Sequence, residues 1–278
     1  MSTLENQVAK ANRFRELHRG PRTLVLPNIW DVAGARVLEE AGVAAIATTS
    51  AGIAFALGYP DGERVSREEM FSVVARIAAK VRLPVTADAE AGYGNRPEDA
   101  ALTARAVVEA GAVGLNLEDG MDDPEQPLAE LSLQLEKIAA VRETARTMGV
   151  PLVLNARTDV YLRQVGKPED RFGETVKRLS AFRDAGADCL FAPGVREPDV
   201  ISRLVRELQH PLNILAGPGS LPISELQKAG VARVSLGSSP MRATLGLVRR
   251  IARELQTAGT YRALEDAPPH SEVNKLLG

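Results

Sequence analysis

The chain has 278 residues, of which 45% are hydrophobic and 25% charged, with a formal net charge of −2. This length suits one large globular domain with an ample core, and the near-neutral charge argues against a nucleic-acid partner. The single cysteine, Cys189, excludes a disulfide framework and a cysteine-rich metal site, and no apolar run approaches the ~20 residues of a membrane span. The N-terminus lacks the basic and apolar segments of a signal peptide, so we expect a cytoplasmic protein without a membrane partner.

Two marks alternate along the chain, and each precedes a short apolar run. Proline stands before four of the runs, and it suits the first position of a strand because it has no N–H for the ladder. An Ala-Gly pair stands before the other four, as is typical after a helix that ends in a left-handed glycine. In chain order the marks are Pro21, Gly42, Pro84, Gly111, Pro151, Gly186, Pro211 and Gly230. We interpret the eight runs as buried strands of a parallel sheet.

Helical patterns separate the runs. They cover residues 32–41, 66–81, 100–110, 128–148, 175–185, 198–208, 223–229 and 241–258. Eight strand–helix units in a chain of this length predict an α/β fold of the (β/α)8 TIM-barrel type, because a doubly wound sheet seldom contains eight units spaced so evenly. No low-complexity linker divides the sequence, so we predict a single domain over residues 1–278, with 259–278 as a C-terminal docking tail.

The stretch from Val85 to Asn95 carries two acids at the end of an apolar run. Asp88 and Glu90 lie two residues apart, and residues at this spacing on a strand point to the same side. Adjacent acids repel each other unless a cation lies between them, and hard cations prefer oxygen ligands. We therefore predict a site for Mg2+ or Mn2+ here. The alternative is a surface pair of acids that faces water.

Other predicted strand ends add charged side chains to the same rim. The active site of a TIM-type barrel lies at the carboxyl ends of its strands, so Asp61 and Glu118 are expected beside the first two acids. A bound divalent ion would neutralise such an acidic cluster. Arg157, on the strand after Glu118, suits bidentate binding of a substrate carboxylate or phosphonate. Its alternative role is a salt bridge with Asp159 or Glu118.

Small and polar residues at the remaining strand ends are candidates for substrate binding. The backbone N–H groups of Thr49, Ser50 and Ala51 are predicted to cradle a second anionic end of the substrate. Asn213, on the seventh predicted strand, is a further candidate contact. Trp30, the only tryptophan, either walls the pocket or packs in the core.

Four motifs follow one another along the chain: Gly-Tyr-Pro-Asp (58–61), Thr-Ala-Asp-Ala-Glu-Ala-Gly-Tyr-Gly (86–94), Asn-Leu-Glu-Asp (116–119) and Asn-Ala-Arg-Thr-Asp (155–159). In these motifs the sequence resembles the isocitrate lyase / phosphoenolpyruvate mutase superfamily, and the resemblance extends over residues 28–239. It implies an Mg2+-dependent barrel in which Asp88 contacts the metal and Arg157 grips the substrate carboxylate. The acids that would hold the waters of the metal are Asp61, Glu90 and Glu118.

The resemblance also bears on assembly. Members of the superfamily tend to exchange the eighth helix between paired subunits within a tetramer. It therefore implies a swapped C-terminal helix and a homodimer or homotetramer, in which the tail 259–278 packs on a partner subunit.

The loop after the fourth predicted strand departs from the superfamily pattern. Isocitrate and methylisocitrate lyases carry a Lys-(Lys/Arg)-Cys-Gly-His motif there, whose cysteine is the catalytic acid. Mutases and phosphonopyruvate hydrolases instead supply Lys and Asn near this point. Residues 120–128 of this chain contain no Cys, Lys, His or Asn. Cys189 is expected on the sixth strand, where it reads as a small buried hydrophobe.

A proton carrier must therefore come from elsewhere. Of the three histidines, His18 and His210 precede strands, and only His270 could reach the site, if the tail folds over a rim. The remaining candidates are a metal-bound water, Tyr59, a carboxylate such as Glu118, and Tyr93, which we favour.

Together these features predict a Mg2+-dependent carbon–carbon lyase that acts on a small 2-oxo or 2-hydroxy di- or tricarboxylic acid through a metal-stabilised enolate. The missing loop cysteine favours a reaction like the decarboxylation of oxaloacetate over isocitrate cleavage, and it leaves methylisocitrate cleavage open. The alternatives are a phosphonopyruvate-type enzyme that acts on a P–C bond and a 2-oxo acid binding protein of low activity.

Overall fold

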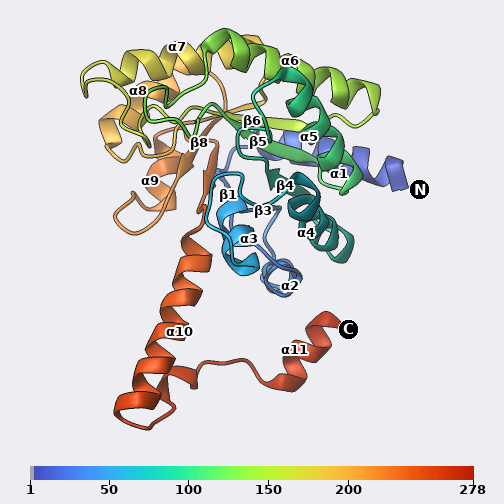
Figure 1. The fold of residues 1–278 in the computed structure, drawn as a ribbon, viewed down its shortest axis with the longest axis vertical. Coiled ribbons are helices and arrows are strands. Elements are labelled where there is room, and N and C mark those ends of the chain that lie inside the picture. Colours follow the sequence, from blue (N-terminus) through green and yellow to red (C-terminus); the bar gives the residue numbers. More distant parts are fainter. Residues whose placement is uncertain (1–2) are drawn as a thin grey trace.

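A computed structural model describes residues 3–278 as a barrel of parallel strands surrounded by helices (Figure 1). The strands are β1 (Leu24–Leu26), β2 (Asn28–Ile29), β3 (Ile46–Thr48), β4 (Val85–Asp88), β5 (Gly114–Glu118), β6 (Val153–Arg157), β7 (Cys189–Phe191), β8 (Leu212–Leu215) and β9 (Arg233–Ser235). The α-helices are α1 (Thr3–Leu17), α2 (Val32–Glu40), α3 (Ser50–Leu57), α4 (Arg67–Lys80), α5 (Pro97–Glu109), α6 (Leu131–Thr147), α7 (Arg171–Asp184), α8 (Pro198–Leu208), α9 (Ile223–Lys228), α10 (Ser239–Thr257) and α11 (His270–Leu277), with a short 3-10 helix, η1 (Arg262–Leu264).

The first predicted strand is interrupted at Pro27, and its two halves close the barrel. β1 pairs with β9, whereas β2 pairs with β3, and all of these pairings are parallel. The remaining strands pair in sequence from β3 to β9, so the ring is complete. Pro27 marks the break because it has no N–H to donate to a neighbouring strand. The prediction of a (β/α)8 TIM-type barrel is confirmed.

The seam between β9 and β3 is held by the side chain of Asn28. Its Oδ1 accepts hydrogen bonds from the backbone N–H groups of Leu236, at 2.8 Å, and Gly237, at 2.9 Å. Its Nδ2 donates to the carbonyl of Thr48 at 2.9 Å. One amide therefore satisfies backbone groups on both sides of the interrupted strand, which a buried seam requires.

The helix α1 lies across the amino ends of the strands and closes the bottom of the barrel. Arg15 donates to the carbonyls of Pro151 and Leu152, at 3.1 and 3.2 Å, and to Asp188 at 3.0 Å, all just before or at the start of β6 and β7. Phe14 on the same helix is 0% exposed. The open end of the barrel is therefore the carboxyl end, where the predicted site residues lie.

The predicted end of the second strand is wrong in one respect, because a helix begins there. Thr49 is the N-cap of α3, and its side chain accepts a hydrogen bond from the N–H of Gly52 at 3.3 Å. Threonine is a favoured N-cap, so the chain turns from β3 into α3 within two residues. Ser50 and Ala51 consequently lie in the first turn of a helix rather than at a strand end.

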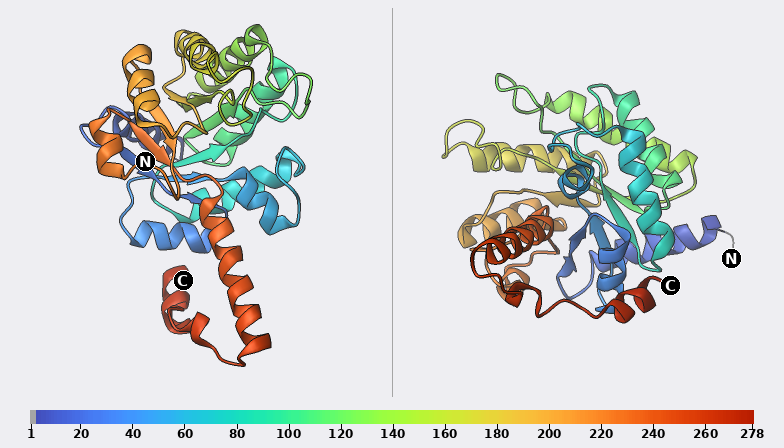
Figure 2. Two further views of the ribbon diagram at one scale, coloured as in Figure 1. Left: turned by 90° about the vertical axis from the view of Figure 1, so that its left-hand side faces the viewer. Right: turned by 60° about the horizontal axis from the view of Figure 1, so that its bottom comes forward.

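The helix α10 projects away from the barrel, and the chain then returns toward α2 through η1 and α11 (Figures 1 and 2). α11 packs on α2, where Arg36 Nε donates to the carbonyl of Leu276 at 3.1 Å. Apolar side chains along α10 are exposed in the single chain; they are Leu245, Leu247, Val248 and Leu255. Val25 on β1 is also 37% exposed, so the barrel wall beside it is incompletely covered.

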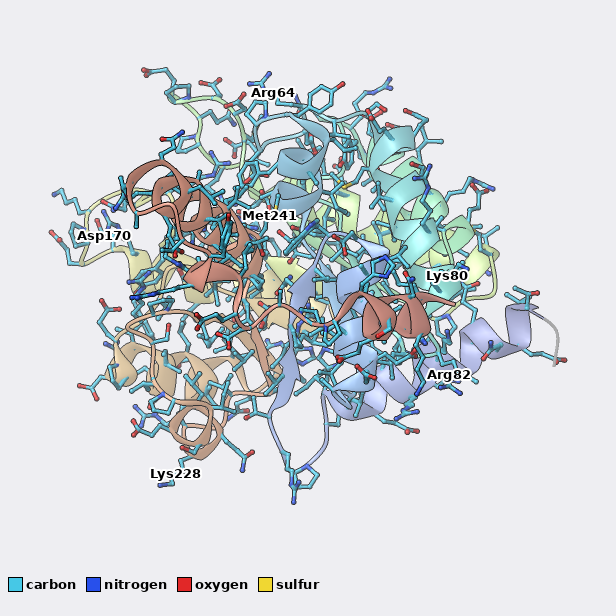
Figure 3. All side chains as sticks on the ribbon, turned by 90° about the horizontal axis from the view of Figure 1, so that it is seen from below. Arg64, Lys80, Arg82, Asp170, Lys228 and Met241 are labelled. Atoms are coloured by element: carbon cyan, nitrogen blue, oxygen red, sulfur yellow. The ribbon has the colours of Figure 1, made fainter. Side chains whose placement is uncertain are left out.

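Viewed along the direction in which α10 leaves the barrel, Met241 at the start of this helix lies near the centre (Figure 3). The labelled charged residues Arg64, Asp170 and Lys228 lie at the edge of the same view. Met241 is 6% exposed, so the first turn of α10 packs against the barrel, whereas the rest of the helix extends away from it. Within residues 3–278 no helix has the length and apolar character needed to cross a membrane.

Candidate active site

A cavity of about 350 Å3 opens at the carboxyl ends of the strands. Most of the predicted substrate and metal residues line it: Thr49, Ser50, Ala51, Asp61, Asp88, Arg157 and Asn213. Further lining residues that the motifs did not single out as ligands include Asn28, Thr48, Thr86, Asn116, Asn155, Phe191, Arg233 and Ser235. The barrel therefore brings together residues from eight of its strands, β2 to β9, and from α3 in one polar cavity.

Asp88 is the best-anchored acid of the cavity. Its Oδ2 accepts hydrogen bonds from the backbone N–H of Ser50 at 3.0 Å and from the Ser50 hydroxyl at 2.7 Å. Its Oδ1 accepts from Asn116 Nδ2 at 3.0 Å, and Oδ1 of Asn116 accepts in turn from Asn155 Nδ2, also at 3.0 Å. Three donors thus fix the carboxylate in one orientation, with lone pairs left for a ligand in the cavity.

Glu90 does not share a strand face with Asp88 as the spacing predicts. β4 ends at Asp88, and Glu90 has a left-handed backbone with φ of 48°. Its carboxylate accepts from the backbone N–H of Glu63 at 2.5 Å. Together with Glu118, it lines a neighbouring hollow of about 490 Å3 instead of the first cavity. The reason is local: β4 ends two residues before Glu90 and the backbone of Glu90 is left-handed, so strand alternation no longer applies to it.

The acids lie close enough to raise one another's pKa. Burial, Asp88 and Asp61 raise the pKa of Glu90 to about 8. Burial and Asp88 raise the pKa of Asp61. Burial also raises the pKa of Glu118, although Arg157 opposes that shift. Burial, and for Asp61 and Glu90 the neighbouring acids as well, thus disfavour the ionised forms of these carboxyl groups, and a bound cation would favour them.

The donor set fits a hydrated hard cation. Among residues 3–278, no three Asp, Glu, His or Cys side chains are grouped tightly enough to chelate a metal ion together. Mg2+ commonly keeps several of its waters and takes only one or two carboxylates directly. The arrangement of one well-fixed carboxylate, Asp88, with Asp61, Glu90 and Glu118 farther out is therefore compatible with Mg2+ and offers only oxygen ligands.

Arg157 forms the salt bridges that were its alternative role, and it also lines the cavity. Its Nη1 lies 2.6 Å from Glu118, and its Nε and Nη2 donate to Asp159 at 2.6 and 3.0 Å. The guanidinium carbon is 5.8 Å from the centre of the Phe191 ring. Although burial opposes its charge, Glu118 and Asp159 raise the pKa of Arg157. Three of the five N–H groups are engaged within the chain, so two remain for a substrate.

The predicted backbone cradle is partly occupied. The N–H of Ser50 donates to Asp88, and the N–H of Gly52 donates to the side chain of Thr49. Trp30 does not line the cavity; it packs against the hydrophobic core, which was its alternative role. Asn213 lies inside the barrel, where its Nδ2 donates to the hydroxyl of Ser235 at 3.1 Å.

Arg233 is a cavity residue that sequence reasoning missed. It lies in the apolar run that follows Gly230, where a charged side chain breaks the pattern. Its spacing of two from Ser235, which also faces the cavity, is the signal that could have found it. An arginine on the inward face of a barrel strand is unusual, since such positions are filled mainly by branched apolar residues.

Comparisons with known proteins agree with this geometry. A family profile described as phosphoenolpyruvate phosphomutase matches residues 14–256. The chain belongs to the phosphoenolpyruvate mutase family. A lyase/mutase structure from Burkholderia cenocepacia J2315 is 39% identical, with a TM-score of 0.92 over 98% of this chain and 96% of that one.

Two further relatives within the wider isocitrate lyase superfamily carry named activities. A structure of oxaloacetate acetylhydrolase with the product oxalate is 26% identical, with a TM-score of 0.86, and the match covers 98% of this chain and 94% of that one. A 2-methylisocitrate lyase of Halalkalibacterium halodurans is 25% identical over 98% of this chain and 91% of its own length. Both match almost the whole of this phosphoenolpyruvate mutase family member.

In this family member the loop after β5 is closed at its base by a backbone hydrogen bond, and contacts of Arg163 and Asp119 hold it in place. Met121 N–H donates to the carbonyl of Pro127 at 2.9 Å, and Arg163 donates to the carbonyl of Met121 at 2.6 Å. Asp119, 1% exposed, accepts from Thr158, from the N–H of Asp159 and from Arg178, at 2.7, 2.9 and 3.1 Å; these contacts fix the start of the loop. The loop contributes Met121, Asp122 and Asp123 to the second hollow.

The candidate proton carriers lie at different depths. Tyr93 does not line the cavity, and burial together with Glu90 raises its pKa. Cys189 is buried on β7, and burial raises its pKa to about 12, which confirms its interpretation as an inert core residue. No described histidine lines the cavity: His18 and His210 contact backbone carbonyls near the bottom of the barrel, and His270 begins α11.

Proposed function

We propose that this protein is a Mg2+-dependent carbon–carbon lyase that acts, in the cytoplasm, on a small 2-oxo or 2-hydroxy di- or tricarboxylic acid. The observation that carries the proposal is Asp88, a carboxylate fixed by three donors at the mouth of a barrel cavity and surrounded by acids with raised pKa values. Such a site demands a cation, and a substrate that brings further negative charge can share it.

Asp88 would contact the metal directly, and Asp61, Glu90 and Glu118 would hold its waters. Mn2+ has the same ligand preference and could replace Mg2+. When bound, the ion would supply Lewis-acid stabilisation of the negative charge that develops on the 2-oxygen of the substrate. The protein side chains then have two tasks, which are to orient the substrate and to carry protons.

Arg157 suits the first task. Its ion pairs with Glu118 and Asp159 hold the guanidinium plane in place, so its two remaining N–H groups can orient a substrate carboxylate without reorganisation. A fixed carboxylate sets the direction of the bond that breaks at the neighbouring carbon. Among the backbone N–H groups of residues 49–51, that of Thr49 donates to the Ile29 carbonyl and that of Ser50 to Asp88, so the N–H of Ala51 is the candidate donor to another oxygen of the substrate.

The second task, proton transfer, limits the reaction. We assign proton transfer to Glu118, which lines the second hollow, and to Tyr93, which is close enough to Glu90 for that acid to raise its pKa. The loop after β5 offers no Cys, Lys or His, so a departing carbanion has no strong acid close by. Loss of CO2 from oxaloacetate needs mainly electrostatic stabilisation, which this site can supply. The proposal therefore favours an oxaloacetate-decarboxylase-like reaction, with 2-methylisocitrate cleavage as the next candidate.

The names of the relatives support this choice of substrate class. Oxaloacetate acetylhydrolase and 2-methylisocitrate lyase are named for reactions of small carboxylic acids, and both match nearly the whole chain. A P–C bond enzyme is the second candidate, because the same family includes phosphoenolpyruvate phosphomutase. A binding protein of low activity would keep Asp88 and Arg157 but would turn over none of these acids.

Turnover of a panel of acids tests the proposal. Oxaloacetate, 2-methylisocitrate, isocitrate and phosphonopyruvate would each be supplied with Mg2+, with EDTA and with the Asp88→Ala variant. Release of pyruvate or glyoxylate from oxaloacetate, 2-methylisocitrate or isocitrate that needs Mg2+ and Asp88 supports the lyase. Release of phosphate from phosphonopyruvate supports the P–C enzyme instead. If none reacts while a 2-oxo acid still raises the melting temperature with Mg2+, the binding protein is the better description.

We also propose that α10 is exchanged between two subunits of a homodimer or homotetramer. The support is the projection of α10 from its own barrel (Figure 2). Apolar side chains along α10 are exposed in the single chain, and so is Val25 on the barrel wall. An exposed apolar helix of this length is unfavourable in water unless another surface covers it.

A further inference from the structure

Arg233 is a buried cation in the cavity that forms no ion pair with any residue that the structure describes. It is 3% exposed, and its Nε and Nη1 are buried without a hydrogen-bond partner within residues 3–278. No carboxylate of the described chain lies within ion-pair distance of it. Its side chain contacts the Phe14 ring, whose centre is 6.0 Å from the guanidinium carbon. An unpaired buried charge is costly, so a compensating anion is expected in the cavity.

The register of the strands shows that Arg233 points into the barrel. One row of paired residues runs from Arg157 to Phe191, from Phe191 to Asn213 and from Asn213 to Arg233. Paired residues on parallel strands project to the same face of the sheet. All four residues of the row line the cavity, so its wall carries an arginine at each end.

The two arginines differ in what neutralises them. Arg157 donates to Glu118 and Asp159, so its charge is balanced within the chain. Arg233 has no carboxylate within ion-pair distance among residues 3–278, and burial lowers its pKa to about 10, which still leaves it charged at neutral pH. Arg233 is therefore the buried cation of the cavity whose charge is not balanced within the described chain, whereas Arg157 can offer its two remaining N–H groups to a substrate whose charge it does not need.

A second polar group, the hydroxyl of Thr86, also lies near the Phe14 ring. A Cβ at Gly114 would lie 3.0 Å from both the Phe14 ring and the hydroxyl of Thr86, so these two groups meet where glycine leaves room. The Thr86 hydroxyl is buried, lines the cavity and has no hydrogen-bond partner in the described chain. Arg233 and Thr86 thus both lie near the Phe14 ring and line the cavity, and each carries a donor without a partner in the described chain that an oxyanion can use.

We propose that Arg233 binds the second carboxylate of the substrate, the one that does not approach the metal, and thereby selects dicarboxylates over monocarboxylates. This inference rests on the proposed function, which places the first carboxylate near Asp88 and Arg157. It assigns opposite ends of one cavity of about 350 Å3 to the two ends of a compact dianion.

Binding of matched acids tests the inference without requiring turnover. The pairs are malate with 2-hydroxybutanoate and 2-oxoglutarate with 2-oxopentanoate, each of which differs by the distal carboxylate, and binding is measured by calorimetry with Mg2+. The wild type should bind the better dicarboxylate at least about tenfold more tightly than its partner, as expected for a buried charge-assisted contact. Equal affinity within both pairs would overturn the inference, whatever the variants do.

Variants test whether Arg233 causes the preference for dicarboxylates over monocarboxylates. Arg233→Met should abolish it and leave the monocarboxylates unchanged, and Arg233→Lys should retain part of it because the charge remains. Arg206→Met, an exposed arginine on α8, is the matched control and should behave as the wild type. A full preference in Arg233→Met, or an equal loss for both acids of a pair, would refute a role in selecting the second carboxylate.

Two measurements distinguish this role of Arg233 from an effect on the metal site and from binding of a simple anion. Mg2+ binding without any acid should be the same in Arg233→Met and the wild type; a loss would mean that Arg233 acts on Asp88 instead. Chloride should not compete with malate, since competition that disappears in Arg233→Met would identify a site for a free inorganic anion. If the dicarboxylate preference holds but no acid is turned over, the lyase proposal fails and the assignment of Arg233 stands.

Discussion

The side-chain amide of Asn116 donates to Oδ1 of Asp88 over 3.0 Å, and it thereby orients the carboxylate that we assign to the metal. Asn155 supports Asn116 from the next strand through a second amide contact of 3.0 Å. The orientation of Asp88 therefore depends on a chain of side chains that crosses β4, β5 and β6. Groups that orient a metal ligand in this way usually affect affinity nearly as much as the ligand itself.

The Asn116→Leu substitution removes this donor at similar volume. We expect the affinity for Mg2+, measured by calorimetry, to fall by about tenfold to a hundredfold, because Asp88 can then rotate about its remaining contacts with Ser50. Asn274→Leu on the exposed helix α11 is the control and should bind Mg2+ as the wild type does. Unchanged affinity in Asn116→Leu would show that Ser50 alone orients Asp88.

Glu90 should make stability depend on pH and on Mg2+. Its pKa is about 8 in the fold and near 4.5 in the unfolded chain, so the folded state holds a proton that the unfolded state releases. Stability should therefore fall as pH rises from about 4.5 to 8, by at most about 1.4 kcal/mol per pH unit from this group.

Mg2+ should reverse the loss, because it binds the ionised form, and its stabilising effect should grow as pH rises through 8. Urea unfolding at several pH values, with Mg2+ and with EDTA, measures both effects. Glu90→Gln should reduce both slopes, since glutamine carries no proton to release. Identical slopes in the variant and the wild type would mean that other acids account for the dependence.

The salt bridge between Arg178 and Asp119 should be a major element of stability. Asp119 is buried, and Arg178 joins it at 3.1 Å and also donates to the carbonyl of Ala129 at 3.0 Å. Arg178→Met leaves a buried carboxylate without its cation, so we expect a loss of about 3–5 kcal/mol in the free energy of unfolding. Lys177→Met is the matched control, because Lys177 pairs with Glu174 at the surface and should contribute less than about 1 kcal/mol.

The exchange of α10 predicts a specific interface. Val248 is 57% exposed in the single chain, and an aspartate there would be buried against a partner barrel. Val248→Asp should therefore lower the molar mass in solution from that of a dimer or tetramer to that of a monomer, as measured by sedimentation equilibrium. Leu102→Asp, on the similarly exposed Leu102 of α5, should leave the mass unchanged. A monomeric wild type would contradict the proposed assembly.

Much of this protein was readable in its amino-acid sequence. The alternating proline and Ala-Gly marks predicted the strands because they act locally: proline cannot donate to a ladder, and glycine accepts the left-handed end of a helix. Asp61, Asp88 and Arg157 were predicted to meet because the carboxyl ends of barrel strands share one rim, and the cavity lining contains all three.

The tertiary structure decided how these groups are partnered. Glu90 leaves the face of Asp88 because the chain turns left-handed after β4, and Arg157 is neutralised by Glu118 and Asp159 because the strand register puts them side by side. Arg233 could not be recognised as an unpaired cation from the sequence, since this depends on which carboxylates the closed barrel brings near it. Local backbone preferences determine where strands and helices form, whereas the charge balance of a buried site depends on contacts between distant segments, which exist only after the ring has closed.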